Sequence, residues 1–314
     1  MVDLHTHSNF SDGELSPDML VNKAIKQGLR AIALTDHDTI KGLEHAAKSA
    51  QDCNAAPHTE NELPPENIKN FHFIPGIEIS INWSKSSGGI IHGAPGLGPG
   101  GEFHLLGLGI KMPADSFKNA VDGLARRRAV RNLEILEKMI ELSLIEPDER
   151  ESVWKELDNI SNGNSLGRPH FAAFLIKRKI VKNINHAFDR FLGVGRPLYV
   201  PKDGLVFEEA AALIRESGGI PVLAHPVSLY VAWGRLPDLI KALKDTGLAG
   251  LEAWHPTAKA GSCRRLEALA HSLGLYVTEG SDFHGSLRPD RKLGYSGRGR
   301  KISDAVLEAI PQLI

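Results

Sequence analysis

Several features that define whole classes of protein are scarce in this chain of 314 residues. Cys53 and Cys263 are its only cysteines, and neither belongs to a CxxC spacing, which favours ordinary small apolar residues in a reducing compartment over a disulfide. There is no long apolar run and no basic leader followed by an apolar core, so neither a membrane span nor a signal peptide is indicated. The net charge of −1 argues against non-specific coating of nucleic acid. We therefore expect a cytoplasmic protein.

The composition is that of a globular protein. Apolar residues make up 42% and charged residues 24% of the chain, and its length suits one large α/β barrel or a barrel with an insert. Short apolar runs typical of buried strands alternate with helical patterns toward both ends of the chain, which predicts a parallel barrel. The expected strands are residues 2–4, 31–34, 71–74, 77–81, 104–108, 198–200, 220–224, 250–253 and 275–278. The expected helices are residues 17–28, 39–49, 207–216, 236–245 and 261–273.

The middle of the chain has a different pattern. Apolar residues recur at helical spacing from residue 113 onward, and no strand pattern returns before residue 198. This segment holds 15 Lys and Arg against 12 Asp and Glu. Its arginines at 126–128 and 131 are expected to form a solvated helix face, from which one of them could reach the substrate. We predict the first part of an α/β barrel in residues 1–111, an all-helical cap in residues 112–197, and the second part of the barrel in residues 198–314.

Side chains that bind metals follow or close several of the expected strands. They are His5, His7, Asp12, His37, Glu78, His104, His225, Asp282 and His284. Strand ends on one face of a barrel bring such residues to one point, and alternate residues such as His5 and His7 face the same side of an extended chain. A single His near a strand end is more often structural, so only the joint pattern favours a site. Imidazole and carboxylate without thiolate suit Mn²⁺, Zn²⁺ or Fe²⁺, and metal-assisted hydrolysis is the first function to test.

The order of these motifs resembles a known family. The segments HTHSNFSDG, LTDHD, GIEIS, HLLGLG, LAHP and GSDFH are similar to the successive motifs of the PHP (polymerase and histidinol phosphatase) superfamily of metal-dependent phosphoesterases. This resemblance covers the chain outside residues 112–197. The insert, with GRPH at residues 167–170 and GRP at residues 195–197, is similar to the branch that contains nucleotide 3′,5′-bisphosphate phosphatases and 5′-to-3′ exoribonucleases.

The resemblance implies a distorted (β/α)₇ TIM-like barrel that holds three divalent metal ions, Mn²⁺ first, with Fe²⁺ or Zn²⁺ as alternatives. Carried over position by position, the first ion takes His5, His7, Glu78 and Asp282, the second takes Glu78, His104 and His225, and the third takes Asp12, His37 and His284. Glu78 would bridge two ions, with a metal-bridging hydroxide as the nucleophile. A carboxylate can hold two cations roughly 3.5–4 Å apart, and metal binding lowers the pKa of water from about 15.7 toward about 7.

Three residues are candidates for contacts with the substrate: Arg168, His170 and His255. Arg168 and Pro169 open a helical pattern, so the guanidinium stands beside free backbone N–H groups, a combination that suits a phosphate. A structural Arg at a surface helix cap is the alternative. His255 could contact the substrate or support a metal ligand.

The stretch of residues 84–101 is rich in Gly and Ser, and it is longer than the family pattern before His104. Residues 96–101 match GxGxxG by letter. They precede an expected strand rather than a helix and include Pro99, which has no N–H donor, so a dinucleotide site is not expected there.

The function predicted from these features is hydrolysis of a phosphomonoester of a nucleotide, either a 3′,5′-bisphosphate or the 5′ end of a short RNA. The expected partner is thus a small phosphorylated substrate, with neither stable duplex DNA binding nor a membrane; the oligomeric state is not predicted. One alternative is a histidinol-phosphate or general PHP phosphatase. Another is a catalytically inactive PHP module that serves as an interaction domain, which is disfavoured because all nine ligand positions hold metal-binding residue types.

Overall fold

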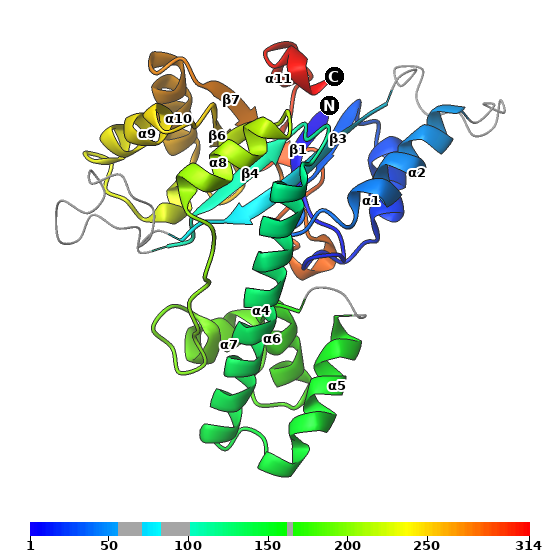
Figure 1. Cartoon of the computed structure of the whole chain (residues 1–314), viewed down its shortest axis with the longest axis vertical. Helices are drawn as coiled ribbons and strands as arrows, with labels where there is room; N and C mark the ends of the chain where they lie inside the picture. The colour runs from blue at the N-terminus through cyan, green and yellow to red at the C-terminus, as the bar shows by residue number, and fades with distance from the viewer. Residues whose placement is uncertain (56–70, 83–100, 162–165) are drawn as a thin grey trace.

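The computed structural model describes residues 1–55, 71–82, 101–161 and 166–314. Seven strands form one sheet in chain order and curve into a nearly closed barrel (Figure 1). They are β1 (Val2–Thr6), β2 (Ala31–Leu34), β3 (His72–Ser80), β4 (His104–Leu108), β5 (Ile220–Leu223), β6 (Gly250–Trp254) and β7 (Tyr276–Glu279). The chain after β7 pairs with β1, because Asp282 N–H donates to His5 O at 2.8 Å and His7 N–H donates to Phe283 O at 3.0 Å. The predicted barrel is confirmed.

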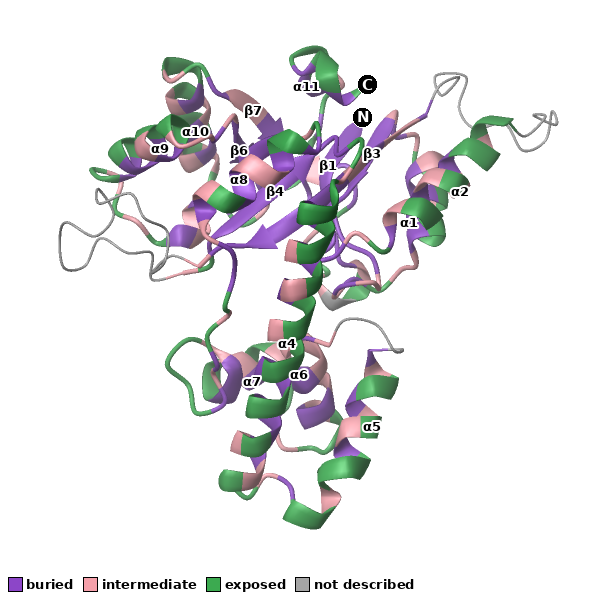
Figure 2. Cartoon of the chain, viewed as in Figure 1, coloured by how far each residue is buried: buried purple, intermediate pink, exposed green. Residues whose placement is uncertain are grey.

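Helices surround this sheet. They are α1 (Pro17–Lys26), α2 (Leu43–Ala55), α8 (Phe207–Glu216), α9 (Leu236–Asp245), α10 (Ala260–Ser272) and the short α11 (Ala305–Glu308). Figure 2 shows most of the sheet buried, with the start of β7 only partly buried, while the helices expose their outer faces. A two-stranded ribbon of β8 (Tyr295–Ser296) and β9 (Arg300–Lys301) follows β7. No helix among the described residues is long and apolar enough to cross a membrane, and both cysteines are free.

The expectation of an all-parallel sheet was wrong for β4. This strand pairs antiparallel with both β3 and β5, whereas the other neighbouring strands pair in parallel. The reversal places the first residue of β4, His104, at the barrel end where the other strands finish. His104, at the start of its strand, therefore lies beside predicted ligands that stand at or after the ends of other strands.

The expected break in β3 at Pro75 and Gly76 was also wrong. The strand runs through both residues and changes partner there: residues 72–75 pair with β2 and residues 76–80 pair with β4. A Cβ atom at Gly76 would lie 2.9 Å from Gly107 O, so a glycine allows the close approach of β4 at this point.

Between β4 and α8 the chain is helical, with α4 (Asp115–Glu141), α5 (Arg150–Ile160), α6 (Arg168–Lys177), α7 (Ile184–Ala187) and a turn of π-helix, Phe188–Leu192. The long helix α4 links the barrel to the other helices (Figure 1). Its first turns pack Phe117 and Leu124 into the barrel core, while Leu136 and Met139 belong to a separate helical core. The division of the chain at residue 112 stays a prediction, because α4 contributes to both cores.

Two other expected elements differ. The residues of the expected strand 198–200 are irregular, because Leu198 and Val200 pack into the helical core instead of joining the sheet. Helix α2 begins at Leu43 and reaches Ala55, later at both ends than expected. The Gly-rich stretch and its GxGxxG match lie outside the described residues, except for their last residue, Gly101.

Candidate metal centre

The nine predicted ligands converge at one end of the barrel. His5 lies in β1, Glu78 lies in β3 and His104 opens β4, while the others lie in the segments after β1, β2, β5 and β7. Glu78 stands at the centre and is fully buried. Its Oε1 lies 2.8 Å from His104 Nδ1 and 2.9 Å from His225 Nε2. Its Oε2 lies 2.9 Å from His37 Nδ1.

The same carboxylate faces the first two histidines. Nε2 of His5 and Nε2 of His7 each lie 3.3 Å from Glu78 Oε2, and the two nitrogens are 3.1 Å apart. Alternate residues at the end of β1 therefore face one point, as their spacing predicted. Asp282 Oδ1 completes this group, at 3.1 Å from His7 Nε2 and 3.6 Å from His5 Nε2.

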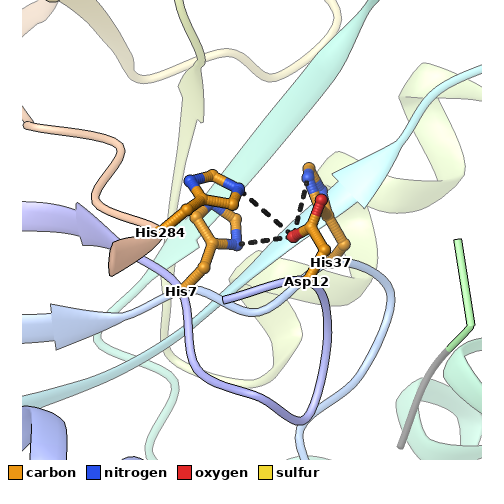
Figure 3. Close-up of side chains that lie close together, drawn as sticks. All are labelled: His7, Asp12, His37 and His284. Carbon is orange, nitrogen blue, oxygen red and sulfur yellow. Dashed lines mark ion pairs between the residues drawn. The ribbon is translucent and has the colours of Figure 1, made fainter. Parts of the chain in front are cut away.

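A second carboxylate, Asp12, gathers three imidazoles (Figure 3). Its Oδ1 lies 3.2 Å from His284 Nε2, 3.8 Å from His37 Nε2 and 4.0 Å from His7 Nδ1. His7 thus stands between this group and the Glu78 group. The third predicted ligand set, Asp12, His37 and His284, is brought together with His7 beside it.

The donors fit a bound divalent cation. Asp12 Oδ1, His37 Nδ1 and Glu78 Oε2 are buried and make no hydrogen bond of acceptable geometry among the described residues, although His37 Nδ1 and Glu78 Oε2 face each other at 2.9 Å. Buried polar atoms without partners are costly, and a cation would satisfy all three. Burial lowers the pKa of His37 to about 4, so its imidazole is neutral near pH 7 and keeps a free lone pair for a metal. Imidazole nitrogen and carboxylate oxygen are the donors that Mn²⁺, Fe²⁺ and Zn²⁺ accept.

The backbone is strained at residues of this centre. Asp38, His225 and Asp282 have φ values of 52°, 29° and 51°, a region that residues other than glycine rarely adopt. Two of the three are predicted ligands, and the third follows the predicted ligand His37. Such strain typically gathers where side chains are held for function.

A carboxylate that the sequence analysis missed supports the ligands from behind. Glu252 in β6 is buried; its Oε1 lies 3.0 Å from His5 Nδ1, and its Oε2 accepts a 2.7 Å hydrogen bond from His225 N–H. A carboxylate at this place favours a proton on His5 Nδ1, while Nε2 faces Glu78. The available signal was an acidic residue within the apolar strand GLEAW.

Two further carboxylates hold the loops that carry ligands. Asp36 accepts hydrogen bonds from Ser8 N–H at 2.8 Å and from Ser11 Oγ at 2.6 Å, which fixes the loop leading to Asp12. Asp38 accepts from Ser80 N–H at 2.7 Å and also contacts the guanidinium of Arg128. Arg128 belongs to α4, so this ion pair joins the helical segment to the loop after His37.

The metal centre opens into a pocket of about 320 Å³ bordered by cationic side chains. Arg128, Arg131, Arg168, Lys202 and Arg291 all line it. The expectation of a solvated arginine face was wrong for two of these residues: Arg128 contacts Asp38, and buried Arg131 donates from Nε to Val200 O at 2.9 Å. The spacing of apolar residues in the sequence could not reveal these contacts, because the partners of Arg128 and Arg131, which lie in the barrel and at residue 200, are remote in sequence.

The three predicted substrate residues differ in position. Arg168, the first residue of α6, lines the pocket; its guanidinium contacts Glu102 Oε1 and donates to Leu192 O at 3.3 Å. His170 is not among the lining residues, and its Nδ1 accepts from Gly167 N–H at 3.0 Å. His255 lines the pocket, with Nε2 at 3.2 Å from Asp282 Oδ2, so it lies among the groups that could hold a metal. Their substrate contacts stay predictions.

Comparison with known proteins agrees with this arrangement. Residues 3–144 match the family model described as PHP domain. The chain is 28% identical over 282 residues to the 5′-3′ exoribonuclease Rnm of Salmonella typhimurium, a match that covers 90% of this chain and 84% of the relative. It is 25% identical over 295 residues to a 3′,5′-nucleoside bisphosphate phosphatase of Chromobacterium violaceum, covering 94% and 91%.

Solved structures share the fold over nearly the whole chain. An amidohydrolase from Chromobacterium violaceum, with bound sulfate and no metal, superposes with a TM-score of 0.76 at 25% identity and covers 98% of this chain and 96% of its own. A structure from Bifidobacterium adolescentis has a TM-score of 0.72 at 24% identity and covers 100% and 96%. The resemblance to the PHP superfamily that the sequence motifs indicated is confirmed.

Proposed function

We propose that this PHP-domain protein is a metal-dependent phosphoesterase that hydrolyses a phosphomonoester of a nucleotide, either a 3′,5′-bisphosphate or the 5′ end of a short RNA. The observation that carries the proposal is a buried group of imidazoles and carboxylates, with three unpartnered donor atoms, at the floor of a pocket bordered by cations. The printed names of the two similar proteins, an exoribonuclease and a nucleoside bisphosphate phosphatase, support nucleotide-related substrates.

The proposed ligand sets are those that the sequence resemblance implies, and the closeness of their side chains supports them. His5, His7, Glu78 and Asp282 would hold one ion, Glu78, His104 and His225 a second, and Asp12, His37 and His284 a third. Mn²⁺ is the first candidate, with Fe²⁺ or Zn²⁺ as alternatives. Divalent metal bound here would supply charge neutralisation for phosphoryl oxygens and a water of lowered pKa.

The protein's own side chains have separate tasks. Lys202 Nζ lies 3.1 Å from His104 Nε2, where it would face the phosphoryl group beside the ligands. Burial lowers the pKa of this lysine. Arg291 contacts Asp282 and would keep that carboxylate turned toward the histidines. These cations would also draw an anionic substrate into the pocket.

Arg168 would bind a second phosphate of the substrate, away from the metal ligands. Its guanidinium packs near the rings of Phe188 and Tyr199, with centroid distances of 5.6 and 5.7 Å, and contacts Glu102. The substrate phosphate would take the place of the Glu102 carboxylate as the partner of the guanidinium. Bidentate pairing of this kind is what makes arginine suited to phosphate recognition.

Two assays test the proposal: phosphate release from the small phosphomonoesters, and chromatography of the nucleotides freed from the RNA, because trimming from the 5′ end releases a mononucleotide and no phosphate. The Mn²⁺-loaded protein should hydrolyse adenosine 3′,5′-bisphosphate or a 5′-phosphorylated short RNA more efficiently than histidinol phosphate. Glu78→Gln should abolish hydrolysis in a folded protein, while Glu134→Gln, an exposed carboxylate on α4, should leave it unchanged. Failure of the metal-loaded wild type on every nucleotide substrate, or full activity of folded Glu78→Gln, would overturn the proposal.

Arg168→Ala separates the second-phosphate role from a structural one. A hydrogen bond to a charged group contributes about 1.5–3 kcal/mol, so hydrolysis of the bisphosphate should fall roughly 10- to 150-fold in kcat/KM. The loss on the matching monophosphate should be much smaller. Arg126→Ala, an exposed arginine of α4, is the control. Equal losses on both substrates would place Arg168 at the scissile phosphate instead.

A further inference from the structure

A second hollow of about 540 Å³ lies between the barrel and the helical segment. Its volume is within the range of about 300–1,000 Å³ that is usual for ligand sites. The barrel contributes Phe10 and Ile40, and the helical segment contributes Val121, Trp154 and Leu166. We call it the Trp154 groove. The hydrolysis of a mononucleotide proposed above does not use this groove.

The Trp154 groove adjoins the pocket of the metal centre. Arg128 lines both hollows. Leu166 lines the groove and the next residue, Gly167, lines the pocket. One cation therefore stands where the two spaces meet, at the site of the Arg128 contact with Asp38. A ligand longer than one nucleotide could reach from the pocket into the groove past this guanidinium.

We propose that the Trp154 groove binds a second nucleotide of a single-stranded substrate whose scissile phosphate lies at the metal centre. This inference rests on the proposed function and narrows its substrate class to oligonucleotides. Trp154 and Phe10 both line the groove and are half-buried, and a nucleobase can stack on aromatic side chains placed in this way. Arg128 lies between the two hollows, where it can pair with the sugar-phosphate backbone of the substrate.

A buried amide in the groove also lacks a partner. Asn132 lines the groove and is only 2% exposed. Its Nδ2 donates to Leu166 O at 2.9 Å, which leaves Oδ1 as the free acceptor, and Oδ1 is buried without a hydrogen-bond partner among the described residues. An exocyclic amino group of a base or a ribose hydroxyl would satisfy it. Unpaired buried acceptors are rare enough in proteins to call for such an explanation.

The charges at the groove favour a nucleotide over a purely apolar ligand. Lys41 and Lys118 are exposed residues on its barrel and α4 sides, respectively. Cations combined with aromatic rings are the usual elements of sites for single-stranded nucleic acid. Asp38, Asp122 and Asp158 also line the groove and equal its cations, Lys41, Lys118 and Arg128, in number. A neutral base and ribose therefore suit the groove better than a dense phosphate array.

The experiment compares two substrates on the Mn²⁺-loaded full-length protein: adenosine 3′,5′-bisphosphate and a 5′-phosphorylated oligoadenylate of three residues. The measured quantity is the ratio of kcat/KM for the oligonucleotide to that for the mononucleotide. Trp154→Ala should lower this ratio roughly 5- to 150-fold, the fold-change that corresponds to stacking of one base, mainly through KM. Trp154→Phe should retain most of the ratio, because a ring remains.

Lys118→Glu provides a second variant in case Trp154→Ala does not fold. It should lower the ratio, whereas the control Lys155→Glu, an exposed lysine that does not line the groove, should leave the ratio at the wild-type value. The inference is overturned if the ratio is unchanged in folded Trp154→Ala or Lys118→Glu, or if the wild type gains nothing from the added nucleotides. Those results would leave the phosphoesterase proposal standing, whereas a wild type inactive on both substrates would overturn both.

Discussion

His5 has two kinds of neighbour, and each ring nitrogen meets a different one. Nδ1 faces the Glu252 carboxylate, and Nε2 faces Glu78 and Asp282. A carboxylate behind a ligand imidazole fixes both its tautomer and its orientation. Glu252 also accepts from His225 N–H, so one side chain holds residues of two predicted ligand sets.

Replacing Glu252 by Gln tests this positioning role. An amide has one acceptor oxygen, so it cannot serve His5 Nδ1 and His225 N–H at once as the carboxylate does. We expect metal affinity to fall about 10- to 100-fold, as for other residues that support metal ligands. Competition with a fluorescent chelator measures it, and Glu44→Gln, an exposed carboxylate on α2, is the control. Unchanged metal affinity in folded Glu252→Gln would exclude the role.

Gly280 makes room for the same pair of side chains. A Cβ atom there would lie 2.3 Å from the His5 Cβ and 2.5 Å from Glu252 Oε1. Gly280→Ala should therefore destabilise the protein by about 1–3 kcal/mol, the usual cost of overpacking, and displace His5. Chemical denaturation measures the free energy of unfolding. Gly261→Ala is the matched control, because a Cβ at that helical position meets nothing within 4 Å; equal effects of the two changes would refute the explanation.

At the level of single residues, the sequence could predict which side chains gather but not all of their supports. The nine predicted ligands could be named because their residue types and their positions at strand ends are visible in the sequence. The structure brings these side chains together. Glu252 could not be assigned, because a lone acidic residue in an apolar strand gives no distance to His5. The roles of Arg128 and Arg131 were hidden for a related reason: their partners, Asp38 and the carbonyl of Val200, are remote in sequence.

At the level of elements, direction and burial decide what the periodic pattern cannot. The pattern located β2, β4, α8 and α9 at the residues that the structure shows. It could not show that β4 runs against its neighbours, because apolar spacing is the same in either direction. Helix α4 is covered by the barrel at one end and by helices at the other, so its buried surface changes along its length.

Helix α4 is expected to depend on a buried arginine. Arg131 is 5% exposed, and its Nε donates to Val200 O at 2.9 Å. Arg131→Ala would leave that carbonyl without its donor, and the unfolding free energy should fall by about 1–3 kcal/mol. Arg126→Ala, on the exposed side of α4, should change it by less than about 0.5 kcal/mol. Thermal and denaturant unfolding compare the two variants, and similar values would mean that the arginines share one solvated surface after all.

At the level of the whole molecule, the metal centre ties the barrel together. Its predicted ligands come from β1, β3, β4 and the segments after β1, β2, β5 and β7, so a bound cation would link distant parts of the chain. The helical segment meets the same region through Arg128 and Arg168. A substitution at this end of the barrel should therefore change metal affinity, the stability of the barrel and the binding of anions in the pocket together.

Removal of divalent metal should lower the thermal stability of the protein. A ligand that binds only the folded state at 100 times its Kd adds about 2.7 kcal/mol, which for a protein of this size corresponds to a fall in Tm of about 4 °C on chelation. Differential scanning fluorimetry with and without EDTA measures the shift, and added Mn²⁺ should reverse it. In a Glu78→Gln, Asp282→Asn variant the shift should be much smaller. A Tm that does not respond to EDTA in metal-loaded wild type would speak against binding at buried donors.

Anomalous diffraction from crystals grown with Mn²⁺ would locate the metals themselves. We predict anomalous peaks at the barrel end within coordination distance of Glu78, one of them shared with His5, His7 and Asp282, another shared with His104 and His225, and a third peak beside Asp12, His37 and His284. Crystals of the Glu78→Gln variant, grown under the same conditions, should lack the peaks near residue 78. Well-ordered side chains at all nine positions with no anomalous signal among them, at saturating Mn²⁺, would contradict the assignment of this site as a metal centre.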